Sequence, residues 1–334
     1  MKAQVLKQHG TIDEIIFQAE FDTPKPGPGE VLIRVRACAL NYHDIFTMRG
    51  MPGIKVPLPV IMGIDAAGEV AELGEGVTGW SSGDRIIVDP INRKTGKLFG
   101  EMVNGGLAEY AVVDQDQLVG LPDSLDFATG AALPCAYGTA YRMMVARGNV
   151  SKGEKVLVLG ASGGVGTCCV QLGKLAGAHV IVAASSQEKL DKLADLGADE
   201  GVNYAEHDFK DWVHEHHGKP RIWGEGGVDV VVNFTGGDTW VRGLRCLTRQ
   251  GRMLTCGATA GFDPKTDIRY IWTFEQSIIG SNGWDKSDIE ALLVLVSDGR
   301  LKPSIERRYP LSETRQAFAD LEARRAFGKL IIEP

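Results

Sequence analysis

The chain has 334 residues, which is long for one small domain and favours two domains. Hydrophobic residues make up 44% of it and charged residues 24%, as in ordinary globular proteins. The formal net charge of −7 argues against nucleic-acid binding. The lack of a long apolar segment argues against a signal peptide and against membrane insertion. We therefore expect a cytoplasmic protein.

The first third of the chain is predicted to be rich in β-strands. Short runs with β-branched residues alternate with turns that contain glycine and proline, a pattern typical of a small barrel-like β unit. The expected strands lie within residues 30–40, 65–74, 79–89 and 105–114.

From residue 123 onward, expected strands alternate with expected helices. Near-continuous apolar strands that alternate with helices predict a parallel sheet covered on both faces. The expected strands are 155–160, 179–183, 229–234 and 252–257, and the expected helices include 165–176 and 188–196. The tail from residue 289 is expected to form a helix, a strand, a helix and a last strand, and to return to the first domain.

A glycine-rich loop, GASGGVG, follows the strand KVLVL and precedes a helix. The spacing G-x-x-G-x-x-G is a variant of the dinucleotide fingerprint, in which glycines permit a tight turn and let the backbone approach a pyrophosphate at a helix N-terminus. The alternative is a turn that only packs the helix on the strand. The cofactor-binding residues expected in this loop are Gly160, Ser162, Gly163, Gly164, Val165 and Gly166.

The end of the next strand indicates which dinucleotide binds. An acidic residue there would accept a hydrogen bond from the ribose of NAD, but the sequence reads AASSQ. Ser185 and Ser186, with Lys189 nearby, suit the 2′-phosphate of NADPH, which requires donors and positive charge. Alternatively, the two serines only cap the following helix.

Several segments together carry a family resemblance that covers essentially the whole chain. They are GASGGVG, KLAGAHVIVAASSQEKLDKLADLGADEGVNY, PGPGEVLIRVRACALNYHD, GIDAAGEVAELGEGV, GGLAEYAVV, LPCAYGTAYRMM and FGKLIIEP. They resemble the quinone oxidoreductase and enoyl reductase branch of the medium-chain dehydrogenase/reductase superfamily. The resemblance implies an α/β fold, with a GroES-like β-rich catalytic domain at 1–122 and 270–334 and a Rossmann domain, a doubly wound parallel sheet, at 123–269.

The resemblance also implies further cofactor contacts and an assembly. Lys189 and Tyr204 match positions that hold the 2′-phosphate of NADPH, and Thr139 matches a position near the nicotinamide carboxamide. Gly257 and Lys329 are also expected to bind the cofactor. A homodimer is usual in this family and is expected here.

No metal site is expected. Relative to the zinc enzymes of this superfamily, Asn41 occupies the first ligand position, the Gly-His-Glu motif reads Gly63-Ile64-Asp65, and only Cys135 keeps a ligand type. Catalytic zinc takes about three protein ligands, so one thiol is not enough. The histidines of HEHHG (His214, His216 and His217) are interpreted as a solvated helix end.

The segment Asn41-Tyr42-His43 is the candidate catalytic site, facing the nicotinamide. Asn41 matches a position that contacts the cofactor ribose or the substrate. His43 titrates near neutrality and could relay a proton, or it could simply bond a ribose hydroxyl or Asp44. The Tyr42 hydroxyl could donate a hydrogen bond to an enolate oxygen, or its ring could form a wall of the pocket.

The predicted function is NADPH-dependent reduction of a small molecule with an activated C=C bond, an enone or an enoyl thioester. A quinone could accept the same hydride, so an NADPH:quinone oxidoreductase is the first alternative. A non-catalytic NADPH-binding protein is the second, because a fold alone never fixes a function.

Overall fold

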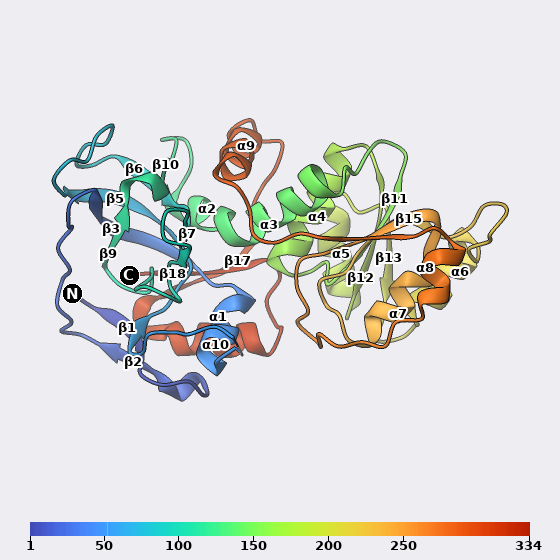
Figure 1. The fold of residues 1–334 in the computed structure, drawn as a ribbon, viewed down its shortest axis with the longest axis horizontal. Helices are drawn as coiled ribbons and strands as arrows, with labels where there is room; N and C mark the ends of the chain where they lie inside the picture. Colours follow the sequence, from blue (N-terminus) through green and yellow to red (C-terminus); the bar gives the residue numbers. More distant parts are fainter. Residues whose placement is uncertain (52) are drawn as a thin grey trace. The chain divides into compact units, whose positions relative to one another are not determined.

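The computed structural model describes residues 1–51 and 53–334 (Figure 1). The chain divides into two units, each with its own internal contacts. Unit 1 comprises Met1–Tyr137 and Lys286–Pro334, and unit 2 comprises Gly138–Asp285. The domain bounds expected from the resemblance, 1–122 with 270–334 and 123–269, stay a prediction.

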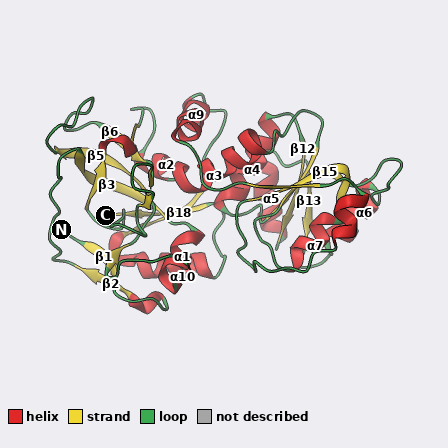
Figure 2. Cartoon of the chain, viewed as in Figure 1, coloured by secondary structure: helices red, strands yellow, loops and turns green. Residues whose placement is uncertain are grey.

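Unit 1 is built mainly of strands, shown in yellow in Figure 2. Its elements are β1 (Ala3–Leu6), η1 (Ile12–Glu14), β2 (Ile15–Gln18), β3 (Glu30–Ala39), α1 (Tyr42–Arg49), β4 (Val60–Ile61), β5 (Asp65–Leu73), β6 (Arg85–Val88), β7 (Ile91–Asn92), β8 (Lys97–Leu98), β9 (Tyr110–Asp114), η2 (Gln115–Gln117), β10 (Leu118–Gly120), α2 (Phe127–Ala131), η3 (Leu133–Tyr137), α9 (Lys286–Ser297), β17 (Ile305–Pro310), η5 (Leu311–Glu313), α10 (Thr314–Glu322) and β18 (Lys329–Glu333).

The main sheet of unit 1 joins both ends of the chain. Its strand order is β10-β6-β5-β3-β18-β17, and β9 pairs with β3. Ile331 of β18 lies opposite Ala39 of β3, so the tail returns to the first part of the chain as predicted. Side chains from this sheet, such as Ile33 and Val70, form one buried core, and α1 packs on a second core through Ile45 and Met48.

Unit 2 is a parallel sheet flanked by helices. Its elements are α3 (Gly138–Tyr141), η4 (Arg142–Arg147), β11 (Lys155–Leu159), α4 (Gly164–Leu175), β12 (His179–Ala184), α5 (Gln187–Asp195), β13 (Glu200–Asn203), α6 (Phe209–His217), β14 (Val228–Val232), α7 (Asp238–Leu244), β15 (Leu247–Thr255), α8 (Ile268–Thr273) and β16 (Ser277–Gly280).

The strand order of unit 2 is β13-β12-β11-β14-β15-β16, with every pair parallel. This is the doubly wound order, in which the chain starts at a central strand and its connections leave to both sides. β11 and β12 are buried along almost their whole length, because helices cover both of their faces. The predicted Rossmann sheet is confirmed. The glycine-rich turn that follows β11 lies at the carboxyl end of that strand.

Candidate functional site

The turn after β11 in unit 2 has the backbone shape of a dinucleotide-binding loop. Gly160 has a φ of +72°, a conformation that L side chains rarely adopt, and it lies against the ring of Phe234. A Cβ on Gly166 would lie 2.3 Å from the carbonyl oxygen of Gly160, so a larger residue cannot fit there. At Gly163, by contrast, the nearest atom to an added Cβ is 3.7 Å away, which leaves space above the turn.

The first N–H groups of α4 open into this space. Gly163 is the N-cap of α4, and the amide of Thr167 is bonded to the Gly163 carbonyl. Helix geometry leaves the N–H groups before Thr167 without intrahelical partners, and the positive end of the helix dipole favours an anion there. Ser162, Gly164 and Val165 are each half-buried. The loop therefore fits a diphosphate group.

The residues expected at the 2′-phosphate gather at the carboxyl end of β12. Ser185 is exposed directly after the strand, and the hydroxyl of Ser186 accepts a hydrogen bond from the amide of Lys189 at 3.4 Å. Tyr204 is 52% exposed, and its amide bonds the carbonyl of Ala184 at 2.9 Å. Ser186 thus caps α5, whereas Ser185 and Tyr204 are left facing solvent.

Two other predicted cofactor residues belong to unit 2. Thr139 lies in α3, which packs against α4. Gly257 follows β15, and an added Cβ there would lie 3.7 Å from the carbonyl oxygen of Phe234. Gly160 and Gly257 therefore both lie next to Phe234, at the carboxyl edge of the sheet.

The predicted catalytic segment of unit 1 begins α1. Asn41 is its N-cap, and the Asn41 amide donates to the Asp44 carboxylate at 2.7 Å, as expected for an acid in the first turn. Asp44 is fully buried, and burial raises its pKa to about 6, although the Asn41 amide opposes the shift. Tyr42 packs edge-on against Phe46, with ring centroids 5.3 Å apart.

The His43 ring is paired with a carboxylate that sequence reasoning missed. Its Nε2 lies 2.6 Å from Oε2 of Glu101, which also accepts a hydrogen bond from the Thr47 hydroxyl at 3.0 Å. Burial disfavours the imidazolium, but the hydrogen bond and charge of Glu101 outweigh it, with help from Asp44, and raise the His43 pKa. For Glu101, burial acts against ionisation, yet His43 and Thr47 lower its pKa.

A buried ammonium lies beside Asn41. Lys329 is 1% exposed, and its Nζ lies 2.5 Å from Oδ1 of Asn41 and 3.3 Å from Oδ2 of Asp65. Asp65 also accepts hydrogen bonds from the Asn41 amide group at 2.8 Å and from the Cys135 backbone at 2.9 Å. Burial raises the pKa of Asp65, and Lys329 with the two donors opposes that rise. The chain thus places its own cation among the positions where zinc relatives place ligands.

The histidines of the segment HEHHG do not behave alike. His214 is half-buried and bonds the carbonyl of Arg245, and the exposed His216 stacks on Trp212 with ring centroids 4.1 Å apart. The side chain of His217, however, is only 8% exposed. The prediction of a solvated cluster is wrong for His217, because the last turn of α6 points this ring inward at the sheet.

In residues 1–51 and 53–334, no helix has the length and apolarity needed to cross a membrane. The six cysteines are free thiols, and Cys38, Cys168, Cys169 and Cys246 are buried.

Comparison with known proteins agrees with this architecture. Residues 27–123 match the family described as alcohol dehydrogenase GroES-like domain, and residues 164–298 match the family described as zinc-binding dehydrogenase. The acryloyl-coenzyme A reductase of Metallosphaera sedula is 31% identical, over 99% of both chains. The human quinone oxidoreductase is 29% identical, over 99% of this chain and 97% of its own.

Solved structures give the same result. One described as an NAD-dependent alcohol dehydrogenase has a TM-score of 0.91 and 33% identity, covering 100% of both chains. The 2-octenoyl-CoA carboxylase reductase CinF, solved with NADP and 2-octenoyl-CoA, has a TM-score of 0.84 and 28% identity, covering 96% of this chain and 82% of its own. The names of these proteins are those of reductases, oxidoreductases and dehydrogenases; one is called NAD-dependent, and one was solved with NADP and an acyl-CoA. The chain belongs to the medium-chain dehydrogenase/reductase superfamily, as an oxidoreductase of its quinone oxidoreductase and enoyl reductase branch.

Proposed function

We propose that this protein is an NADPH-dependent reductase that transfers a hydride to the activated C=C bond of an enone or enoyl thioester without zinc. The observation that carries the proposal is the turn of residues 160–166, where Gly163 has open space beside it and the first N–H groups of α4 have no intrahelical partners, as a diphosphate site requires. Thioester reduction is favoured because the relatives include an acryloyl-CoA reductase and a structure with bound 2-octenoyl-CoA.

In this proposal unit 2 binds the cofactor. The loop from Gly160 to Gly166 holds the diphosphate, Thr139 and Gly257 contribute near the nicotinamide, and Ser185, Ser186, Lys189 and Tyr204 bind the 2′-phosphate. When bound, the reduced nicotinamide supplies the hydride. NADPH is favoured over NADH because the end of β12 is followed by an exposed serine, Ser185, and by no acid before Glu188.

The donor set of unit 1 does not fit a catalytic zinc ion. An amide, a carboxylate and one thiol stand at or beside the matching positions, and the Lys329 ammonium lies against Asn41 and Asp65. A second cation at that place would be repelled by the ammonium, and an amide is a poor zinc ligand. We therefore assign Lys329 the task of holding Asn41 and Asp65 in place, in addition to its predicted contact with the cofactor.

His43 is the proposed proton donor. Glu101 orients the ring and favours the imidazolium, which is the form that can deliver a proton to the α-carbon after hydride transfer. Asn41 positions the reactants, and Tyr42 either donates to the enolate oxygen or forms a wall of the pocket. Donors directed at a developing oxyanion stabilise the transition state.

Two other functions share the same cofactor loop. An NADPH:quinone oxidoreductase is supported by the similarity to the human enzyme of that name, because a quinone accepts hydride in a comparable pocket. A non-catalytic NADPH-binding protein would keep the loop without turning over any acceptor.

A substrate panel distinguishes these functions. The loss of NADPH absorbance is followed with chelator-treated protein and enoyl-CoA thioesters, enones and quinones. Rapid turnover of the thioesters supports the leading proposal, and turnover of quinones alone selects the alternative. Tight NADPH binding with no turnover of any acceptor contradicts both enzyme assignments.

A homodimer in the cytoplasm remains our prediction. Large apolar side chains are exposed on and around α8 in unit 2, with Ile268 and Trp272 at 68% and 69% exposure, and an apolar patch of this kind supports association. Sedimentation velocity distinguishes a dimer from a monomer.

A further inference from the structure

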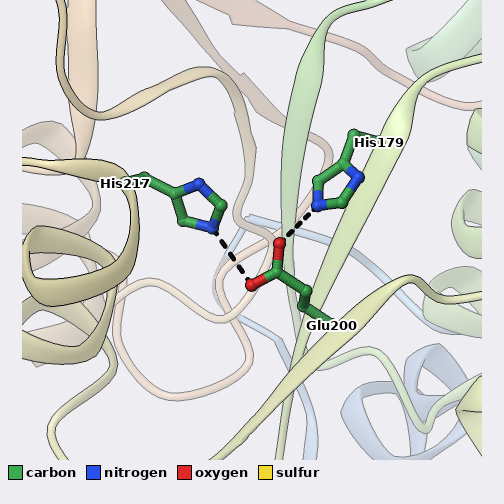
Figure 3. Close-up of side chains that lie close together, drawn as sticks. All are labelled: His179, Glu200 and His217. Atoms are coloured by element: carbon green, nitrogen blue, oxygen red, sulfur yellow. Dashed lines mark hydrogen bonds and ion pairs between the residues drawn. The ribbon is translucent and has the colours of Figure 1, made fainter.

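Three side chains that are far apart in the sequence meet at the amino edge of the unit 2 sheet. His179 is the first residue of β12, Glu200 is the first of β13, and His217 is the last of α6 (Figure 3). In a parallel sheet all amino ends lie at the same edge, whereas the loop Gly160–Gly166 follows the carboxyl end of β11. The cluster is therefore separate from the proposed cofactor site.

The carboxylate of Glu200 lies between the two rings. Its Oε1 is 2.5 Å from Nε2 of His179, and its Oε2 is 3.4 Å from Nε2 of His217. One ligand atom from each residue lies within 4.8 Å of the others. Figure 3 shows both imidazole nitrogens directed at the same carboxylate.

The imidazole of His217 is buried and has a nitrogen that makes no hydrogen bond. Its side chain is 92% buried, and among the residues that the structure describes its Nε2 has no hydrogen-bond partner, although it is near the charge of Glu200. A buried nitrogen left in this way destabilises the fold, and a bound ion would remove that cost.

The surroundings carry charges of both signs. Oδ2 of Asp199 lies 3.7 Å from Nδ1 of His179, the position from which a carboxylate orients a metal-bound imidazole. The carboxyl end of α6, which carries a partial negative charge, is at His217. Lys174 is paired with Asp199 at 2.7 Å, and Lys155 opposes a cation.

We propose that His179, Glu200 and His217 bind a divalent transition metal, represented by Zn²⁺, which ties the end of α6 to β12 and β13. Two imidazoles and a carboxylate are a common zinc donor set, with a water molecule as the fourth ligand. Bonds of about 2 Å would draw the donor atoms to roughly 3.3 Å from one another. The side chain of His179 is 40% exposed, and the proposal requires its ring to shift by this amount. The ion is structural, because it lies at the edge of the sheet away from the cofactor loop.

The experiment is a calorimetric titration of the chelator-treated full chain with ZnCl₂, together with its thermal unfolding. We expect one Zn²⁺ per chain and a higher Tm with Zn²⁺. Removing a partner outside the first shell costs 10- to 100-fold in affinity, so His179→Gln and His217→Gln should each weaken binding by more than about 100-fold. The matched control, His214→Gln, alters a half-buried ring three residues away, outside the cluster, and should bind Zn²⁺ like the wild type.

Three results would overturn the proposal. No Zn²⁺ binding to the wild type would mean that the two imidazoles only contact the carboxylate of Glu200. Equal binding by wild type and His217→Gln would place the ion elsewhere. A thiolate charge-transfer band in the Co²⁺-loaded wild type would assign the ion to a cysteine, and this spectrum does not depend on whether the variants fold.

Discussion

The imidazole of His43 shares a short hydrogen bond, 2.6 Å from Nε2 to Oε2, with Glu101, a carboxylate that is only 2% exposed. A buried acid that faces a partly exposed imidazole fixes the orientation of the ring and favours its protonated form. The same arrangement orients histidines in other proton-transferring sites. The pair is the most direct structural support for a proton donor in unit 1.

This pair predicts a specific pH dependence. If protonated His43 donates the proton, kcat is full at pH below the His43 pKa and falls as the pH rises through it. Replacing Glu101 by Gln leaves burial as the largest influence on His43, so its pKa drops and the fall in kcat shifts to lower pH. The measurement is kcat against pH at saturating NADPH.

His43→Ala is the companion variant. It should lower kcat by about 10²- to 10⁴-fold, the usual contribution of a general acid. An unchanged kcat would remove His43 from the reaction, and water would then be the proton source.

Alanine substitutions at two glycines of the loop are expected to have different effects on stability and on NADPH affinity. Gly166→Ala forces a Cβ against the Gly160 carbonyl, so both the Tm and NADPH affinity should fall. Gly163→Ala meets open space in the protein and should keep its Tm, but the methyl group projects where the diphosphate would lie, so the Kd for NADPH should rise at least tenfold. Fluorescence titration and calorimetry measure the two effects, and a Gly163→Ala variant with wild-type affinity would contradict the placement of the diphosphate.

Cofactor choice is expected to depend on Ser185. An aspartate there would repel the 2′-phosphate and accept a hydrogen bond from the ribose hydroxyls of NADH. Ser185→Asp should therefore lower kcat/KM with NADPH by more than about tenfold and raise it with NADH, since one unfavourable charge contact costs over about 1.4 kcal/mol at close range. Ser186→Ala is the control, because Ser186 caps α5 and should affect mainly stability. If the ratio of kcat/KM with NADPH to kcat/KM with NADH were the same in the wild type and in Ser185→Asp, this residue would not determine the choice of cofactor.

Lys329 is expected to be essential for the stability of unit 1. Lys329→Met leaves the carboxylate of Asp65 buried without its countercharge, and breaking a buried pair in this way costs about 3–5 kcal/mol. The double variant Lys329→Met with Asp65→Asn removes both charges and should recover part of the loss. Urea unfolding monitored by circular dichroism tests this, and a double variant no more stable than Lys329→Met would show that the pair is not coupled.

The sequence predicted the parts of the fold that depend on local pattern. β3, β5, β11 and β12 are expected from apolar and β-branched runs, and α4 and α5 from the alternation of helices with those strands. β13 was missed because its sequence, EGVN, is short and polar, and it forms only by pairing with β12. α1 was missed because two of its four buried residues, Asp44 and Thr47, are polar, so the buried face does not show as an apolar pattern in the sequence.

The candidate sites show the same division. The glycine loop could be read from the sequence because a strand, a turn and a helix follow one another directly. Glu101 is 58 residues from His43, and Lys329 is 288 residues from Asn41, so only the folded chain brings these pairs together. Glu200 and His217 meet in the same way at β13 and α6, and no spacing along the chain indicates their contact.

Isotope transfer tests the central claim most directly. Chelator-treated protein is incubated with NADPH that carries deuterium at the nicotinamide C4 position and with crotonyl-CoA, and the product is examined by NMR. We predict butyryl-CoA with deuterium on the β-carbon and a solvent-derived proton on the α-carbon. Recovery of unreduced crotonyl-CoA, or of product without deuterium at the β-carbon, would contradict the proposed reaction.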